Sequence, residues 1–355
     1  MIQKFPISRD DRLYHAWPDV ALTATGRLVC VFSECTHHGD RSYTRVMLTT
    51  SEDRGRSWTP KRPLTEPLSG DPAENEYWNC ARISTLSDGR LAVAVDRLLG
   101  KELSRRRTRN LLYFSDDEGE SFSGPVETPA EGIVPDQVIE LREGENAGRW
   151  LIGAHEVTNG DTDQATWQQR TWFSDDRGAT WSAPVLAASE PGLQLCEGSL
   201  VELPGGVLVV FMRENSNLGR DAYKAVSRDG GQSWGPATRF PLPGCHRPVA
   251  GVLASGRVMI THRYNPGGRP KWGRWQNTFA ALADVDSCLA GQRNDASVRI
   301  LPLDYDRHVE SDCGYTGWVQ FEDGEIYVVN YLLDDHPRGQ IRGYAFGEDE
   351  FLLGA

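Results

Sequence analysis

The stretch SDDRGATW, residues 174–181, is one of four copies of a short phrase in this chain of 355 residues. The other copies are SEDRGRSW (51–58), SDDEGESF (115–122) and SRDGGQSW (227–234). In the shared pattern S-x-D-x-G-x-[ST]-[WF], the Asp can accept backbone N–H groups of its own turn, Gly supplies a positive φ, and the closing aromatic packs beneath the loop. We therefore predict four hairpin turns. A calcium loop is disfavoured because the alternating ligands of such loops are absent.

A second phrase, a glycine turn followed by an apolar strand, occurs six times. Its copies are TGRLVCVFSE (25–34), DGRLAVAVDR (88–97), AGRWLIGAHE (147–156), GGVLVVFMRE (205–214), SGRVMITHRY (255–264) and DGEIYVVNYL (323–332). The turn glycines at 26, 89, 148, 206, 256 and 324 lie 50 to 68 residues apart, enough chain for one four-stranded sheet per interval. Helical periodicity is weak, and radial repetition lets short strands bury both faces of each sheet. We predict an all-β fold, a six-bladed β-propeller with four-stranded antiparallel blades, formed as one domain by residues 1–355.

Composition excludes several classes of partner. The chain has 38 basic and 50 acidic residues and a net charge of -12, which disfavours a general nucleic-acid or anionic-membrane surface. No stretch approaches the roughly 18 apolar residues of a membrane span, and the first residues lack a signal-peptide pattern. We therefore expect a cytoplasmic protein, or a secreted one if a leader has been removed. The arginine-rich segment GKELSRRRTRN (100–110) is predicted to be a solvated hairpin.

The sequence offers no sign of a cofactor. No nucleotide loop, metal-ligand cluster or Ser-His-Asp spacing stands out, so we expect neither cofactor nor metal. The seven cysteines are scattered and contain no CxxC pair, which predicts reduced, half-buried thiols. The oligomeric state stays open.

Polar residues recur in register at both ends of the repeated turn. Nine residues before the turn glycine stand Trp17, Cys80, Glu197, Arg247 and Tyr315, with Asp136 near the equivalent place in the third repeat. Seven residues after it stand Ser33, Asp96, His155, Arg213, Arg263 and Tyr331. Taken alone, an arginine at this position would be expected to form an ion pair at the surface, and His155 would be expected to make only structural hydrogen bonds. Because desolvated charges are costly unless paired or used, their recurrence around a propeller axis predicts a ligand site. Several arginines with a Glu and a Tyr suggest recognition of a carboxylate.

These features resemble those of the sialidases. The four S-x-D phrases, the sixfold repeat and the segments EGSLVELPGGVLVVFMR (197–213) and GYTGWVQFEDGEIYVV (314–329) carry the resemblance. It implies an exo-glycosidase on a six-bladed propeller that uses an arginine triad, a Tyr/Glu nucleophile pair and an Asp acid/base. Residue by residue, it implies Tyr315 as nucleophile, Glu197 as its partner and Asp40 as acid/base. Arg213 and Arg274 match the second and third arginines of the triad.

The first arginine of the triad has no counterpart. Where sialidases have an R-I-P motif, this chain has HAWPDV (15–20), with Ala16 in place of Arg. The possible replacements are Arg247, Arg263, Arg41 and Arg12, and the axial register favours Arg247. His155 and Asp136 are further substrate-binding candidates.

The residue types fit the chemistry that the resemblance implies. A carboxylate nucleophile would repel the carboxylate of an acidic sugar, whereas the neutral phenol of Tyr315 would not. Glu197 would take the phenolic proton, and Asp40 would protonate the leaving oxygen and then activate water. The first hypothesis is therefore a retaining exo-glycosidase that removes a terminal sialic acid or a related acidic sugar.

Two other hypotheses remain open. The same pocket could act on another acidic sugar, by elimination or by a hydrolytic mechanism that involves Asp136 or His155. The fold could also serve as a non-catalytic glycan-binding propeller. In each case the expected partner is an acidic carbohydrate; its identity and linkage stay open.

Overall fold

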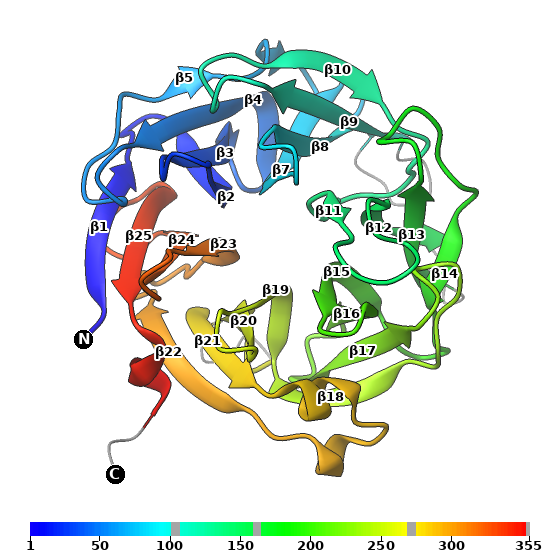
Figure 1. The fold of residues 1–355 in the computed structure, drawn as a ribbon. Helices are drawn as coiled ribbons and strands as arrows, with labels where there is room; N and C mark the ends of the chain where they lie inside the picture. Colours follow the sequence, from blue (N-terminus) through cyan, green and yellow to red (C-terminus); the bar gives the residue numbers. More distant parts are fainter. Residues whose placement is uncertain (101–106, 159–164, 268–274, 353–355) are drawn as a thin grey trace.

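Six antiparallel sheets surround a central axis, as Figure 1 shows. The computed structural model describes residues 1–100, 107–158, 165–267 and 275–352. The predicted all-β, six-bladed propeller is confirmed. Within the described ranges, helical structure is limited to α1 (Val285–Leu289) and the 3-10 turns η2 (Arg293–Asp295) and η3 (Glu348–Phe351).

Each of the first three blades begins with its innermost strand and proceeds outward. Blade 1 comprises β2 (Tyr14–Leu22), β3 (Leu28–His37), β4 (Asp40–Ser51) and two short outer pieces, β5 (Arg62–Pro63) and β6 (Leu68–Ser69). Blade 2 comprises β7 (Tyr77–Thr85), β8 (Leu91–Leu99), β9 (Arg107–Ser115) and β10 (Ser123–Glu127). Blade 3 comprises β11 (Ile139–Glu140), β12 (Trp150–Thr158), β13 (Thr166–Ser174) and β14 (Val185–Ala188). The segment 101–106, within the predicted arginine-rich hairpin, lies outside the described residues.

The remaining blades follow the same order. Blade 4 comprises β15 (Leu195–Leu203), β16 (Val207–Glu214), β17 (Asp221–Ser227) and β18 (Thr238–Pro243). Blade 5 comprises β19 (Cys245–Val252), β20 (Val258–Tyr264), β21 (Asn277–Ala283) and β22 (Arg299–Tyr305). Blade 6 comprises β23 (Gly314–Gln320), β24 (Ile326–Leu332), β25 (Gln340–Phe346) and, as its outermost strand, β1 (Gln3–Ser8) from the N-terminus.

The N-terminal strand closes the ring. β1 pairs antiparallel with β25, from Gln3 opposite Ala345 to Ser8 opposite Ile341, and the two strands lie side by side in Figure 1. This pairing covers the outer edge of the last blade with the first segment of the chain, so the last sheet does not leave a long open edge.

The four S-x-D phrases form the predicted turns. In the third, the Ser174 hydroxyl donates to Asp176 at 2.8 Å and accepts the Gly178 N–H, while Asp176 accepts both the N–H and the hydroxyl of Thr180. The same bonds recur around Asp53, Asp117 and Asp229. The glycine of each turn has a positive φ, as predicted. The closing aromatics pack against the hydrophobic core: Trp58, Phe122, Trp181 and Trp234.

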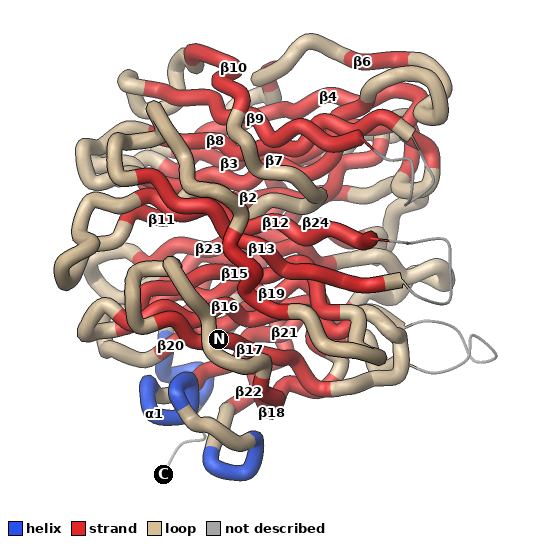
Figure 2. The backbone as a smooth tube through the Cα atoms, turned by 90° about the vertical axis from the view of Figure 1, so that its right-hand side faces the viewer, coloured by secondary structure: helices blue, strands red, loops and turns tan. Residues whose placement is uncertain are grey.

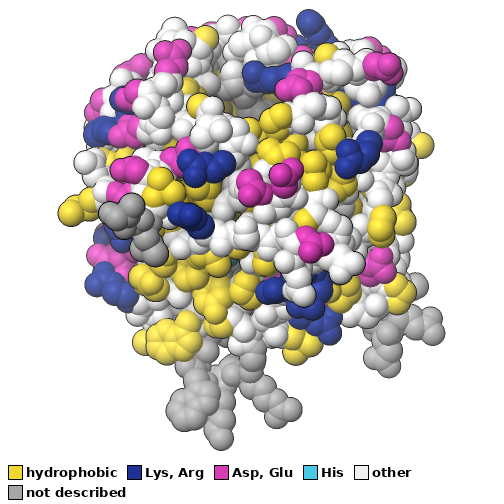
Figure 3. Space-filling view, turned by 60° about the horizontal axis from the view of Figure 1, so that its bottom comes forward, with side chains coloured by type: hydrophobic (Ala, Val, Ile, Leu, Met, Phe, Trp, Pro, Cys, Tyr) yellow, Lys and Arg dark blue, Asp and Glu magenta, His cyan; other side chains and the backbone are white. Residues whose placement is uncertain are grey.

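Neighbouring blades share their hydrophobic cores. Between blades 4 and 5, for example, Phe211 packs in one cluster with Ile260. All seven cysteines are free, as expected, but fully rather than half buried. In the described ranges, no helix is long and apolar enough to cross a membrane. Side on, the loops lie at the two ends of the strands (Figure 2), and the coloured surface of Figure 3 shows acidic and basic side chains interspersed.

A bulge at the start of the innermost strands turns one residue toward the axis. The pairing register shifts there in five blades, for example between Cys196 and Ser199. Five residues at this position have a positive φ: Trp17, Val134, Glu197, Arg247 and Tyr315. In blade 3 the residue is therefore Val134. Asp136, which the sequence placed near the equivalent position, lies two residues further along the chain.

A substitution at Gly317 can test how closely the inner strands pack around the axis. A Cβ at this position would lie 1.9 Å from Asp19 Oδ1 and 2.7 Å from Asp19 Cα. We expect Gly317→Ala to lower the free energy of unfolding by about 1 to 3 kcal/mol, the usual cost of overpacking. Urea denaturation measures it. Gly291→Ala, where a Cβ meets nothing within 4 Å, is the control and should not lose stability. Equal midpoints for the two variants would contradict this picture of the axis.

Candidate active site

A cavity of about 290 Å³ opens where the inner strands begin. Its walls come from blades 1, 2, 3, 4 and 6, so residues far apart in sequence meet there. The lining residues are Trp17, His38, Gly39, Arg41, Pro72, Tyr77, Asn79, Cys80, Leu98, Ile133, Val134, Glu197 and Tyr315. The volume lies near the lower end of the range for small-molecule sites.

Tyr315 and Glu197 meet at the floor of this cavity. The Tyr315 hydroxyl, on β23, donates to Glu197 Oε1, on β15, at 2.5 Å. Arg213, on β16, donates from Nη1 to both oxygens of the same carboxylate at 2.9 Å. The structure thus brings together three of the residues that the sequence resemblance singled out.

The surrounding charges set the ionisation of this pair. Burial alone would raise the pKa of Glu197, but Arg213, His155 and the Tyr315 hydroxyl outweigh burial and hold it well below its ordinary value. Burial, and then the negative charge of Glu197, raise the pKa of Tyr315 well above 10. The site therefore holds a neutral phenol hydrogen-bonded to an ionised carboxylate.

Local sequence keeps the two side chains in place. Gly198 follows Glu197 because a Cβ there would lie 2.7 Å from the Gln169 side chain, whose Oε1 accepts the Gly198 N–H at 3.0 Å. His155 Nδ1 accepts the backbone N–H of Glu197 at 3.3 Å. His155 thus contacts the backbone of the site and does not line the cavity.

Arg263 lies against the ring of Tyr315. Its guanidinium carbon is 5.1 Å from the ring centroid, and Nη1 donates to Gln276 at 3.1 Å. Gly314 permits this contact, since a Cβ there would lie 2.6 Å from Arg263 Cβ. Arg263 therefore packs against the ring of Tyr315.

The β3–β4 hairpin supplies Arg41 to the cavity wall. Its guanidinium stacks on Trp17, 3.9 Å from the ring centroid, and Nη2 donates to Asn79 Oδ1 at 2.8 Å. The buried Nη1 has no hydrogen-bond partner among the described residues. Asp40, by contrast, is exposed at the hairpin tip, accepts the Ser42 N–H at 2.9 Å and is not among the lining residues.

A carboxylate that the sequence reasoning missed lies near the cavity. Asp312 accepts hydrogen bonds from Tyr14 at 2.6 Å and Tyr331 at 2.9 Å, and Oδ2 lies 2.5 Å from His38 Nδ1. Burial alone would raise its pKa, but the His38 contact, with Arg263 and Tyr14, lowers the pKa of Asp312 to about 2. The only sequence signal was its position three residues before Tyr315, beside a candidate nucleophile.

Arg247 and Asp136 lie below the cavity. Arg247 is completely buried; its guanidinium donates to the carbonyls of Gly198 at 3.1 Å and Pro135 at 3.3 Å, and lies 3.6 Å from Asp136 Oδ1. Asp136 in turn accepts the Leu200 N–H at 2.6 Å. These contacts join blades 3, 4 and 5, so the axial register of Arg247 reflects a link between blades.

The other proposed arginines lie elsewhere. Arg12 is exposed, on the segment before β2, and Arg274 lies outside the described residues. Of the replacements considered for the missing arginine at Ala16, Arg41 is the one that lines the cavity.

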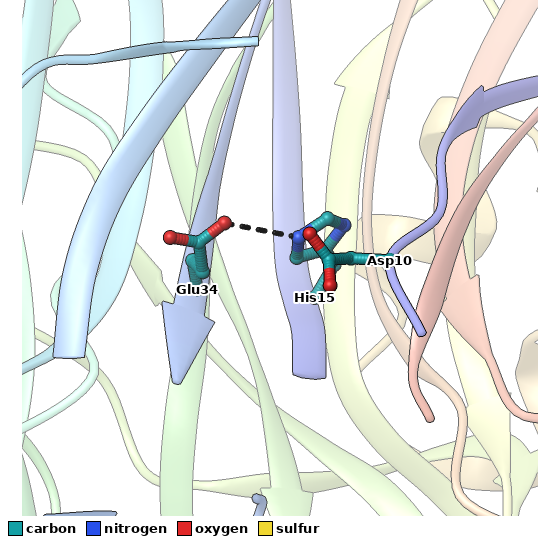
Figure 4. Close-up of side chains that lie close together, drawn as sticks. All are labelled: Asp10, His15 and Glu34. Carbon is teal, nitrogen blue, oxygen red and sulfur yellow. Dashed lines mark hydrogen bonds and ion pairs between the residues drawn. The ribbon is translucent and has the colours of Figure 1, made fainter. Parts of the chain in front are cut away.

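Three potential metal ligands gather in blade 1, outside the cavity. Figure 4 shows Asp10, His15 and Glu34 close together. The Lys61 ammonium lies 2.9 Å from Asp10, 2.9 Å from His15 and 2.5 Å from Glu34. It already supplies the positive charge that the carboxylates require, so this cluster is a network of ion pairs rather than a metal centre.

Comparison with known families agrees with this architecture. The family model described as a BNR repeat-like domain matches residues 73–274, more than half of the chain. The chain belongs to the BNR-repeat propellers of the sialidase superfamily.

Curated relatives match only parts of this BNR-repeat propeller. An anhydrosialidase from Macrobdella decora is 30% identical over 141 residues, which cover 38% of this chain and 17% of that protein. A sialidase from Micromonospora viridifaciens is 36% identical over 102 residues, covering 28% and 14%. The matches thus span less than a fifth of either relative.

Solved structures show the same fold over nearly the whole propeller. A protein of unknown function from Dyadobacter fermentans has a TM-score of 0.77 at 21% identity, covering 97% of this chain and 98% of that one. The intramolecular trans-sialidase from Ruminococcus gnavus has a TM-score of 0.69 at 13% identity, covering 96% of each. A leech intramolecular trans-sialidase, complexed with 2,7-anhydro-Neu5Ac, has a TM-score of 0.69 at 13% identity, covering 96% of this chain and 69% of that one.

Disrupting the buried pair of Arg247 and Asp136 is expected to destabilise the protein. Arg247→Met removes the cation that lies 3.6 Å from the buried Asp136, so we expect the free energy of unfolding to fall by about 3 to 5 kcal/mol. Chemical denaturation measures the change, with Arg12→Ala as an exposed control that should match the parent. A stable Arg247→Met variant that fails to bind an acidic sugar would instead show a ligand-binding role.

Proposed function

We propose that this propeller is a retaining exo-glycosidase that removes a terminal acidic sugar, a sialic acid or a related nonulosonate. One observation carries the proposal: the 2.5 Å hydrogen bond from Tyr315 to Glu197, with Arg213 holding the carboxylate at 2.9 Å. A neutral phenol beside an ionised base is the pair required to attack an anomeric carbon that bears a carboxylate.

In the proposed reaction Tyr315 Oη bonds to the anomeric carbon as the glycosidic C–O bond breaks. Glu197 accepts the phenolic proton, and a general acid protonates the leaving oxygen. The Tyr315 proton is bound tightly in the free protein, so its transfer has to accompany formation of the bond to the sugar. Arg213 and Arg263 stabilise the negative charge that develops on the phenol oxygen. Water then releases the sugar from Tyr315, and the tyrosine recovers its proton from Glu197.

Arg41 is the proposed partner of the sugar's carboxylate. It lines the cavity and stacks on Trp17, and its Nη2 donates to Asn79, another lining residue. Because Ala16 offers no side chain for this purpose, the hairpin arginine takes the place of the family's first arginine. A charge-assisted bond from a guanidinium would give the cavity its preference for acidic sugars.

Intramolecular transfer is the second candidate. The cavity lining includes the apolar side chains of Trp17, Leu98, Ile133 and Val134, and apolar lining limits access of water to the sugar bound at Tyr315. The relatives named as an anhydrosialidase and as intramolecular trans-sialidases fit this alternative. NMR of the product separates the cases: a reducing sugar indicates hydrolysis, an anhydro sugar indicates internal transfer, and an unsaturated sugar indicates elimination.

Tyr315→Phe tests the nucleophile. Removing the hydroxyl should lower kcat by about 10² to 10⁴-fold or more, since both the attacking oxygen and its proton are lost. Binding of an acidic sugar should change little because the ring and its contact with Arg263 remain. A fluorogenic α-sialoside assay, run beside a panel of other acidic ketosides, gives turnover, and calorimetry gives binding. Unchanged turnover would exclude Tyr315 as nucleophile.

Arg41→Ala tests carboxylate recognition. We expect binding of the free acidic sugar to weaken by about 1.5 to 3 kcal/mol, the worth of a hydrogen bond to a charged group. The matched analogue with an alcohol in place of the carboxylate should lose much less. Calorimetry on both sugars makes the comparison, with Arg12→Ala as the exposed control. An equal loss for the two sugars would assign Arg41 a role in packing only.

A further inference from the structure

His38 lies on the wall shared by two cavities. One is the cavity that holds Tyr315 and Glu197; the other, of about 430 Å³, is lined by residues that include Tyr14, His37, Gln276 and Asp312. His38 and Gly39 line both. A sugar bound in the first cavity with its leaving group in the second would place its glycosidic oxygen beside the β3–β4 hairpin.

A buried carboxylate orients the His38 ring. Nδ1 lies 2.5 Å from Asp312 Oδ2, and the ring meets Trp17 edge to face, with centroids 5.2 Å apart. Trp17 also contacts the ring of Tyr315, with centroids 6.4 Å apart. The side chain of His38 is 43% exposed, that of Asp312 only 13%. The imidazole of His38 is therefore held by Asp312 and Trp17, and the rest of the ring is accessible to a ligand.

The contacts of Asp312 define which nitrogen of His38 carries a proton. Its carboxylate accepts the hydroxyls of Tyr14 and Tyr331, and its backbone N–H donates to Asp306 at 2.9 Å. Because an ionised carboxylate faces Nδ1, this nitrogen carries a proton and donates it. Nε2, on the far side of the ring, is then the nitrogen that can exchange a proton with a ligand.

Asp40 is less well placed for the same task. Arg41 lines the cavity, whereas Asp40 is not among the lining residues. The Asp40 carboxylate accepts the N–H of Ser42 on its own strand and is exposed.

We propose that His38, oriented by Asp312, is the acid/base of the glycosidic reaction, an assignment that rests on the proposed function. In the first step the bond from Tyr315 Oη to the anomeric carbon forms and the glycosidic C–O bond breaks. The imidazolium of His38 gives its Nε2 proton to the leaving oxygen, and Glu197 takes the phenolic proton. In the second step neutral His38 takes a proton from water, and the water oxygen bonds to the anomeric carbon as the bond from that carbon to Tyr315 Oη breaks. Tyr315 then recovers its proton from Glu197. Asp312 is a positioning residue in both steps.

Dependence on the leaving group separates an acid from a structural residue. A substrate with a good leaving group, such as a 4-methylumbelliferyl glycoside, leaves without a proton, whereas an alkyl glycoside of the same sugar requires one. We expect His38→Gln to lower kcat/KM on the alkyl glycoside by about 10² to 10⁴-fold and on the aryl glycoside much less. Asp312→Asn should show the same selectivity to a smaller degree.

Three comparisons complete the experiment. Arg12→Gln, a change at an exposed residue that lines neither cavity, should match the parent on both substrates, and Asp40→Asn should show no selectivity for the leaving group. Thermal unfolding establishes that each variant is folded. Selective loss in Asp40→Asn, or equal loss on the two substrates in His38→Gln, would overturn the assignment while leaving the proposed function intact. A parent protein inactive on every acidic glycoside would overturn both.

Discussion

The left-handed backbone at the start of the inner strands is the constraint on which the site depends. In a regular strand, side chains alternate between the two faces of the sheet, and none would point along the axis. The bulge breaks this alternation, and Glu197 and Tyr315 both have φ near 50°. Such a conformation costs a non-glycine residue of order 1 to 3 kcal/mol, and the surrounding contacts have to offset that cost.

Bonds between blades hold the bulged strands in place. Asp19 accepts the Ile83 N–H at 2.9 Å, Asp136 accepts the Leu200 N–H at 2.6 Å, and Ser199 accepts the Ala250 N–H at 3.0 Å. Each bond passes from one inner strand to the next around the axis. The residues near the axis therefore form two layers. The first layer contains Asp19, Asp136 and Ser199, which join neighbouring blades. The second layer contains the bulge residues, each two positions earlier in the chain, and it includes Glu197 and Tyr315. The second layer lines the cavity through Trp17, Val134, Glu197 and Tyr315, whereas Arg247 at the same position joins neighbouring blades.

The sequence predicted the elements whose determinants are local. The S-x-D turns and the glycine turns depend on interactions within a few residues, so both could be recognised locally, and the six glycine turns gave the number of blades. Closure by β1 depends on pairing with β25, more than 300 residues away, and no local pattern indicated it. The shared position nine residues before the turn glycine identified Glu197 and Tyr315, and the structure shows that their side chains are in contact. That shared position could not show that Asp136 and Arg247 make contacts between blades. Asp136 lies two residues beyond the bulge, and Arg247, although it lies at the bulge, donates to backbone carbonyls of neighbouring blades. Asp312 and His38 belong to no repeat, and only the folded chain brings them together.

The arrangement divides the chemistry between rigid and adjustable parts. The proposed nucleophile and its base are mounted on inner strands that neighbouring blades hold on both sides, which suits a proton transfer that depends on a 2.5 Å contact. The groups proposed to read the sugar's carboxylate and protonate the leaving oxygen, Arg41 and His38, come from one hairpin that rests on Trp17. Position 16 carries alanine instead of an arginine, and the indole of the adjacent Trp17 contacts both Arg41 and His38. A change in that hairpin would alter which sugar binds and which bond is protonated, while the Tyr315–Glu197 pair stayed the same.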